Sequence, residues 1–554
     1  MLRRRPLRIF AAITLLLIVI CVTQPWLEVL SDVNTPTHIN LPGDKRTGVN
    51  RIMKSSYDWG SAFAHFPVTS TIPVPTGQPL KQPKIQYNFP ADTRHVRHGL
   101  ELQRLEVKKA FQKCWKNYRK YAWMKDELAP ISGTGKDTFG GFAATLIDAL
   151  DSLWIMDLKD EFTEAVEAVA TIDWANTTAT SLNMFETTIR HLGGLLSAYD
   201  LSHEQVLLAK AVELGDMLYA GFDTPNRMPG FWIDFEKAKS GGQTADDHQP
   251  SASPCSMSLE FTRLSQLTGN AKYYDAITRV TKELEKHQNA TLLPGMWPAF
   301  IDMRGLRFDQ DNYFTIGALS DSLYEYLPKM HALLGNLDPV YGRLARSSLA
   351  VVDKYILFRP MLPDGADVLF AGDIRVDKEG KADMNAEGQH LSCFAGGMFA
   401  LSGRLFGIPN YVDIGTKLTN GCIYAYNAFP TGIMPEYFNM LPCRSRASCE
   451  WDEGRWKEQG DAKLPKGFKD ARVPTYLLRP EAIESAFVLY RVTGQTEFQD
   501  MAWKMFQAIM KATDTEFGNA AIEDVTVNSG IIKMDSMEVC CMTCSVGLCC
   551  ANWS

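Results

Sequence analysis

Two distant stretches of this 554-residue chain follow one helical pattern. Residues 259–280 read LEFTRLSQLTGNAKYYDAITRV, and residues 485–506 read SAFVLYRVTGQTEFQDMAWKMF. Each predicts a helix that ends at Thr-Gly and a second helix after it, because glycine commonly follows a helix C-terminus. LLSAYDLSHEQVLLAKAVEL and LWIMDLKDEFTEAVEAV repeat the pattern more loosely. The chain is therefore expected to form a series of helical hairpins.

Apolar residues recur at helical spacing from Leu102 to about Ala512, and continuous β alternation is scarce. We therefore expect an all-α body. Helical hairpins either stack into an open solenoid or close into an α/α toroid, and periodicity does not separate the two. Acidic residues (64) outnumber basic ones (57), so the charge balance argues against a nucleic-acid partner.

The N-terminal residues MLRRRPLRIFAAITLLLIVICV place four arginines before an uncharged apolar run from Ile9 to Val22. This order predicts a cytosolic tail over residues 1–8 and a signal-anchor segment over residues 9–30, with the remainder across the membrane. The run is shorter than the roughly 20 residues that a span needs, so a cleaved, secreted form stays open. Sequons at Asn176, Asn289 and Asn552 agree with a luminal location in the endoplasmic reticulum or Golgi.

Residues 31–98 are polar and rich in proline, which disfavours long helices and predicts extended chain. We expect this segment to be a luminal stem, although short apolar pieces such as KIQYNF could pack on the body. The main domain is then expected over residues 99–538. A cysteine-rich tail follows over residues 539–554.

Several acidic residues occur inside otherwise apolar helical segments: Glu186, Asp321, Glu436, Glu481 and Glu484. Burying a carboxylate costs free energy unless the group is paired or hydrogen-bonded. Each has an ordinary explanation on its own. Glu481 follows Pro480 at a helix start, and Glu186 stands four residues before Arg190, as in a simple helical ion pair. Together they indicate an acidic pocket along the axis of a toroid.

Such a pocket suits a polyhydroxylated sugar, with aromatic walls expected from Phe185, Tyr324, Phe394 and Tyr437. Glycoside hydrolysis needs one protonated carboxylic acid for the leaving oxygen and one carboxylate that activates water or attacks carbon. An apolar surrounding raises the pKa of the acid, and a neighbouring arginine keeps the other group ionised. No phosphate-binding loop, GxSxG, HExxH or dinucleotide motif competes with this interpretation.

From about Leu105 to Glu538, the same segments resemble the class I α-1,2-mannosidases of glycoside hydrolase family 47. Their sequences are most similar to those of the fungal members. The matching stretches include TLIDALDSLWIMDL, FETTIRHLGGLLSAYDLS, SLEFTRLSQLTG, GALSDSLYEYLPK, HLSCFAGGMFALS, PTGIMPEYF and LLRPEAIESAFVLYRVTG. The resemblance implies an (α/α)7 barrel that removes α-1,2-linked mannose from oligomannose N-glycans with inversion. It also implies a monomeric, calcium-dependent glycosidase, with the ion at the barrel floor.

The resemblance carries roles onto individual residues. Glu186 would be the general acid and Glu481 the base, with Asp321 and Glu436 as further catalytic carboxylates. The residues that would shape the sugar pocket or the hydrated metal are Arg190, Glu260, His390, Arg479, Glu484 and Glu538. No residue of this chain is assigned as a direct metal ligand. Inversion agrees with carboxyl groups roughly 6.5 to 9.5 Å apart, which leave room for a water.

The cysteines divide into three groups. Cys393 and Cys422 match the structural disulfide of the family, and such a bridge contributes about 2 to 4 kcal/mol. Cys443 and Cys449 flank the polar loop RSRAS and could form a second bridge. Cys114 lies in an apolar helical stripe and is expected to be a core residue rather than a ligand.

The resemblance stops after Glu538. In the family, a last helix and a C-terminal β-hairpin follow; the hairpin plugs the barrel, and its threonine binds calcium. Here the tail holds Cys540, Cys541, Cys544, Cys549 and Cys550 instead. A metal site, a disulfide cluster and an altered gene model or splice product are the possible explanations. The sequence thus predicts a barrel without its last helix and plug, impaired in folding or catalysis.

Two other functions compete with the glycosidase. A non-catalytic relative would bind oligomannose and release no mannose. A helical interaction scaffold would need no acidic cluster, so that cluster argues against it.

Overall fold

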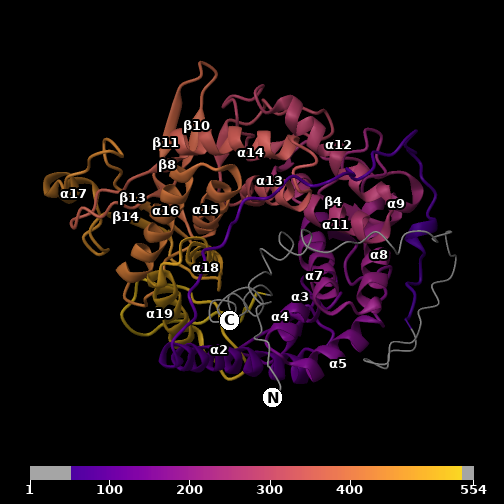
Figure 1. Ribbon diagram of the computed structural model, residues 1–554, viewed down its shortest axis with the longest axis horizontal. Helices are drawn as coiled ribbons and strands as arrows, with labels where there is room; N and C mark the ends of the chain where they lie inside the picture. The colour runs from indigo at the N-terminus through magenta and orange to yellow at the C-terminus, as the bar shows by residue number, and fades with distance from the viewer. Residues whose placement is uncertain (1–51, 539–554) are drawn as a thin grey trace.

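The protein is described here by a computed structural model over residues 52–538. Two layers of helices form a ring (Figure 1). The inner layer consists of α3 (Ala144–Asp148), α4 (Leu150–Ile155), α7 (Gly193–Ser202), α11 (Ser258–Thr268), α13 (Asp321–Leu333), α15 (Ala395–Phe406) and α18 (Glu481–Thr493). The outer layer consists of α2 (Arg94–Tyr121), α5 (Lys159–Val169), α8 (Gln205–Ala220), α12 (Ala271–His287), α14 (Val340–Val351), α16 (Pro409–Ala428) and α19 (Thr496–Thr513).

The expected hairpins are present. The packed pairs are α4–α5, α7–α8, α11–α12, α13–α14, α15–α16 and α18–α19. The two Thr-Gly turns end α11 and α18, where Gly269 and Gly494 take positive φ angles of 70° and 77°. Only glycine adopts this conformation without steric cost, so the pattern recognised in the sequence sets where these helices stop.

The ring closes between the first and last outer helices. The ammonium of Lys113 in α2 lies 2.5 Å from Asp514, directly after α19. In the same contact, the thiol of Cys114 faces the Asn519 side-chain oxygen at 3.4 Å. The chain is therefore a closed toroid rather than an open solenoid, and Cys114 is a buried core residue. The predicted loss of a last helix and plug falls on residues 539–554, outside the described range.

Short strands and helical turns connect the helices at the rim. Three-stranded antiparallel sheets have the orders β11-β10-β7 and β12-β13-β14, and two-stranded pairs are β1-β2, β3-β4, β5-β6 and β8-β9. The strands are β1 (Glu127–Leu128), β2 (Gly135–Lys136), β3 (Ser181–Asn183), β4 (Trp232–Asp234), β5 (Gln249–Pro250), β6 (Phe300–Ile301), β7 (Tyr313–Thr315), β8 (Leu357–Phe358), β9 (Phe370–Ala371), β10 (Asp373–Val376), β11 (Ala382–Asn385), β12 (Glu387–Gln389), β13 (Tyr437–Met440) and β14 (Phe468–Val473). The short helices include α6 (Met184–Glu186), α9 (Phe235–Ser240), α10 (Ala252–Cys255) and α17 (Glu453–Gln459), with η2 (Trp59–Ser61), η3 (Thr187–Leu192), η4 (Val352–Ile356) and η5 (Leu391–Phe394).

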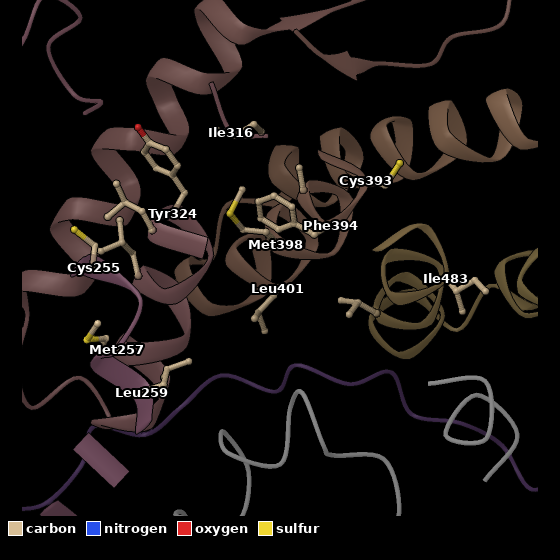
Figure 2. Close-up of a cluster of buried hydrophobic side chains, with 14 of the residues drawn as sticks. Cys255, Met257, Leu259, Ile316, Tyr324, Cys393, Phe394, Met398, Leu401 and Ile483 are labelled. Atoms are coloured by element: carbon tan, nitrogen blue, oxygen red, sulfur yellow. The ribbon is translucent and has the colours of Figure 1, made fainter. Parts of the chain in front are cut away.

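Inner helices meet through a continuous apolar core. Figure 2 shows Tyr324, Met398 and Ile483, from α13, α15 and α18, within one part of it. Disulfide bonds join Cys393 to Cys422 and Cys443 to Cys449. The first bridge joins η5, directly before α15, to α16, as the resemblance implied, and the second closes the RSRAS loop.

The described part of the proline-rich segment before α2 is extended, as expected, and lies against the barrel. We call residues 52–91 the strap. Its backbone donates hydrogen bonds from Met53 to the Ala170 carbonyl, from Phe66 to Asp223, from Ile72 to Asp275, from Leu80 to the Gly335 carbonyl and from Tyr87 to the Arg491 carbonyl. Within the strap, Trp59 and Ile85 are buried. The predicted domain boundaries stay predictions, since residues 1–51 lie outside the described range.

Within residues 52–538, none of the helices combines the length and the apolar character that crossing a bilayer requires. The predicted anchor over residues 9–30 falls outside this part of the chain.

Candidate active site

Inner helices start at the residues expected to carry the chemistry. Asp321 is the first residue of α13, and Glu481 is the first residue of α18. Glu186 ends α6, which continues through η3 into α7. With α3 and α4 counted as one inner helix, each inner helix is followed by an outer helix that returns, so the inner helices run the same way and their N-termini share one end of the barrel. Negative side chains are favoured at such positions by the helix dipole.

Glu186 forms an ion pair with Arg190. The Arg190 Nε donates to Glu186 Oε2 at 2.9 Å, and the Arg190 guanidinium lies 4.6 Å from the centre of the Phe139 ring. Asn183 caps the turn by accepting a hydrogen bond from the Glu186 backbone N–H. The Glu186 side chain is 32% exposed, so this carboxylate is fixed in orientation and still reaches the mouth of the barrel.

Glu436 is nearly fully buried and is paired with Arg479. Arg479 Nε donates to Glu436 Oε2 at 2.5 Å, and the Leu477 N–H donates to the other oxygen at 3.3 Å. Burial would lower the pKa of Arg479, but the charges of Glu436 and Glu481 outweigh it and raise that pKa overall. Both oxygens of Glu436 are occupied, so this residue positions Arg479 beside the other carboxylates.

Glu481 faces a fully buried histidine. His390 Nδ1 lies 3.3 Å from Glu481 Oε2, at an angle that does not make a hydrogen bond. The other ring nitrogen, His390 Nε2, is 2.8 Å from the Tyr426 hydroxyl. The Tyr426 hydroxyl therefore fixes the orientation of the imidazole ring. The Glu481 oxygen beside that ring keeps its hydrogen-bonding capacity for another partner.

Asp321 is a buried carboxyl with an elevated pKa. Burial is the main cause that raises that pKa to about 7. The Ser322 N–H, which donates to Asp321 Oδ1 at 2.7 Å, acts in the opposite direction and lowers it. The negative charges of Glu325 and Glu481 contribute to this rise. A carboxyl in this state holds its proton close to neutral pH, as a general acid must.

A second layer of carboxyl groups lies deeper in the barrel. Burial raises the pKa of Glu260 to about 7, while the Tyr326 hydroxyl donates to Glu260 Oε1 at 2.7 Å. Burial and the charge of Glu325 raise the pKa of Glu484 to about 8. Lys329 compensates part of this negative charge, with its ammonium 2.6 Å from Glu325.

Glu538 joins the site from the end of the described chain. Burial raises the pKa of its carboxyl, the positive charges of Arg479 and Arg190 oppose that rise, and Glu436 adds to it. Glu538 therefore links the two arginine pairs.

Glu127 in β1 is a site residue that the sequence interpretation missed. Burial raises the pKa of its carboxyl, with opposing effects from Glu538 and Arg190 nearby. Glu127 directly follows Asp126 in the stretch MKDELAP, and two adjacent acidic residues in a short connection give no periodic signal.

Two turns beside the carboxylates hold leucines in the left-handed region. Leu319 has φ of 79° two residues before Asp321, and Leu478 has φ of 65° three residues before Glu481. Non-glycine residues adopt this conformation at a cost, and such strain concentrates at functional sites. The surrounding bonds hold the first turn in place, since the Leu319 carbonyl accepts from the Ala252 N–H at 2.9 Å.

Two of the expected aromatic walls are wrong. Tyr324 is buried in the core, where its hydroxyl donates to the Trp297 carbonyl at 2.9 Å. Phe394 is likewise buried among the inner helices, as Figure 2 shows. Both belong to the hydrophobic core, because apolar helix positions serve inter-helix packing first. Phe185 and Tyr437 are half-buried beside Glu186 and Glu436.

The calcium ion that the resemblance implies has no ready-made carboxylate site in the described part of the chain. Over residues 52–538, no three His, Cys, Asp or Glu side chains are placed to hold a metal ion together. Glu538 lies near Arg190 and Arg479, and Glu484 lies near Lys329, so positive side chains already balance these carboxylates.

Residues 110–543 match the sequence profile of Glycosyl hydrolase family 47. Mannosyl-oligosaccharide alpha-1,2-mannosidase IA of Spodoptera frugiperda is 33% identical over 79% of this chain and 61% of the relative. Mannosyl-oligosaccharide alpha-1,2-mannosidase of Coccidioides posadasii is 32% identical over 82% of this chain and 86% of the relative. The chain thus spans about three fifths of the insect protein.

The fold comparison agrees. The solved structure of alpha-1,2-mannosidase from Trichoderma reesei matches with a TM-score of 0.74 at 28% identity, covering 82% of this chain and 94% of that one. The profile match extends over well more than half of the chain and includes every carboxylate described above. This chain therefore belongs to glycosyl hydrolase family 47 and has the (α/α)7 barrel of that family.

Proposed function

We propose that this protein hydrolyses terminal α-1,2-linked mannose of oligomannose N-glycans, with inversion, during glycoprotein processing. The observation that carries the proposal is the meeting of Glu186–Arg190, Glu436–Arg479 and Asp321 beside Glu481 at one end of the barrel. The names of the insect and fungal relatives support the substrate. A monomer with a type II anchor over residues 9–30, in the endoplasmic reticulum or Golgi, belongs to the same proposal.

In the proposed mechanism, Glu186 protonates the glycosidic oxygen and Glu481 activates the attacking water. Arg190 fixes the Glu186 carboxyl, and the buried His390 borders the Glu481 oxygen that would face the water. A specific observation favours Asp321 as a second candidate for the acid, because its pKa of about 7 keeps a proton available. Calcium dependence stays part of the proposal, and no step above passes through the metal.

The role of Glu186 gives the first prediction. Glu186→Gln is expected to lower kcat at least about 100-fold on a nine-mannose N-glycan, since a positioned general acid contributes roughly 10²- to 10⁴-fold. The released mannose is followed by proton NMR in a calcium-containing buffer. Glu497→Gln, at an exposed position of α19, is the matched control.

A substrate that needs no proton separates the candidate acids from the base. On α-mannosyl fluoride, the variant that lacks the acid should keep much of its activity, whether that variant is Glu186→Gln or Asp321→Asn. Glu481→Gln should lose activity on both substrates. Early β-mannose would establish inversion, and early α-mannose would contradict it. A folded parent protein that binds the glycan and releases no mannose would instead support the non-catalytic relative.

A further inference from the structure

One aromatic side chain at the mouth of the barrel has no role in the chemistry above. Trp232 in β4 is 49% exposed, and the other tryptophans within residues 52–538 are buried or half-buried. Its ring packs edge-on against Phe231, with ring centres 5.4 Å apart. A single exposed aromatic side chain is ordinary on a protein surface. A role for Trp232 therefore has to be argued from its position in the barrel.

The hairpin β3–β4 places Trp232 beside the proposed acid. Asn183 and Trp232 are direct partners in the antiparallel register, so their side chains project from the same face with Cβ atoms roughly 4.5 to 5.5 Å apart. The opposite face is the buried one, formed by Leu182 and Ile233. Asn183 is also the residue whose side chain accepts from the Glu186 N–H at 3.0 Å. The indole therefore stands next to the turn that carries Glu186.

The backbone under Trp232 is fixed by buried contacts. The amide of Gln243, itself buried, donates to the Trp232 carbonyl at 2.8 Å. The Phe231 N–H donates to Asp246 at 2.6 Å, and the Phe231 carbonyl accepts from Met184 at 3.1 Å. A tryptophan has only two side-chain torsions, so little conformational entropy remains to be lost when a ligand covers this ring.

We propose that Trp232 stacks on a mannose residue of the oligomannose substrate that lies outside the cleavage pocket. A mannose ring presents C–H bonds on its face and hydroxyl groups at its edges, and the negative face of an indole attracts such C–H groups. Covering the ring also removes apolar surface from water. This inference rests on the proposed function, and it makes Trp232 a determinant of preference for long substrates over short ones.

The test compares two substrates and three variants. Trp232→Ala is expected to lower kcat/KM on the nine-mannose N-glycan roughly 3- to 10-fold, through KM, because an aromatic contact contributes in that range. On α-1,2-mannobiose, which lacks the outer mannose residues that we place on the indole, kcat/KM should stay within about twofold. Trp232→Phe should retain part of the preference. Tyr87→Ala is the control, since Tyr87 is similarly exposed and packs against Gly494 at the other end of α18 from Glu481.

The outcomes separate this inference from the proposed function. An equal loss on both substrates, or no loss on the glycan, would overturn the role of Trp232 while the mannosidase activity stands. If the folded parent cleaves neither substrate, the proposed function fails, and tryptophan fluorescence then decides the inference. Glycan addition should quench emission of the parent and of Tyr87→Ala, but not of Trp232→Phe. Equal quenching in all three proteins would reject the stacking.

Discussion

At the scale of one residue, the buried carboxyl group of Glu260 makes the stability of the barrel depend on pH. Burial raises the pKa of this carboxyl from its ordinary 4.5 to about 7. The unfolded chain releases the proton at a lower pH than the folded protein does. The contribution of Glu260 to stability is therefore complete below about pH 4.5 and is lost as the pH rises through 7.

Glu260→Gln should remove this pH dependence. The glutamine oxygen still accepts from the Tyr326 hydroxyl, and the side chain no longer ionises. From pH 4 to pH 8, the free energy of unfolding of the parent should fall relative to that of the variant by on the order of 3 kcal/mol, since one pKa unit corresponds to about 1.4 kcal/mol. Urea unfolding at several pH values measures the difference. A difference that does not change with pH would contradict a neutral Glu260 in the folded protein.

At this scale, the sequence allowed prediction of the carboxylates that sit in apolar helical stripes. Glu186, Asp321 and Glu481 stand out because a charge among apolar residues needs a reason. Glu127 and Trp232 do not stand out, because each lies in a short connection where polar and aromatic residues are both ordinary. Their place beside Glu538 and Glu186 depends on tertiary contacts between distant segments. Such contacts leave no periodic signal.

At the scale of elements, the Cys393–Cys422 bridge supports the hairpin nearest to Glu481. It joins η5 to α16, and the Cys393 carbonyl accepts a hydrogen bond from Ser485 in α18 at 2.5 Å. His390 directly precedes η5. The bridge therefore steadies the turn that places His390 against Glu481.

Removing that bridge by the double change Cys393→Ala and Cys422→Ala should cost about 3.5 kcal/mol of unfolding free energy, because it closes a span of 29 residues. Removing Cys443–Cys449, which closes 6, should cost less, about 2 kcal/mol. Denaturant unfolding of the two double variants ranks them. A larger loss from the second bridge would show that loop closure does not govern their contributions.

The elements themselves were predictable to different degrees. Helix ends at Gly269 and Gly494 follow from residue type, because both positions need a positive φ. The leucines at 319 and 478 were not predictable, since leucine is not a usual residue in that conformation and only the assembled barrel holds it there. Tyr324 and Phe394 were expected to line the pocket, but both are buried in the core. Helical spacing shows which face of a helix is apolar, and it does not show what that face packs against.

At the scale of the whole molecule, the strap fastens helices that are far apart in the sequence. It bonds to residues at the ends of α5, α13 and α18 and to acidic side chains near α8 and α12. The buried ammonium of Lys210 donates to the Ile172 carbonyl at 2.7 Å and also to the Met53 carbonyl of the strap. Prolines predict the extended chain, but bonds from its backbone to scattered carboxylates have no sequence pattern.

A chain that begins at Thr93 instead of Ile52 should therefore be less stable and equally active. Losing the strap uncovers the surface against which Trp59 and Ile85 pack, a contribution of roughly 3 to 6 kcal/mol before the entropy of ordering the strap is deducted, and leaves Lys210 without its Met53 acceptor. The strap contacts of the inner helices are at the C-terminal ends of α13 and α18, away from Asp321 and Glu481. Thermal unfolding should shift to lower temperature, while kcat/KM per folded molecule at 25 °C stays within about twofold of the parent. An unchanged midpoint of thermal unfolding would mean that ordering the strap costs as much free energy as its contacts contribute. A loss of kcat/KM in the folded protein would mean that the strap also maintains the shape of the barrel mouth.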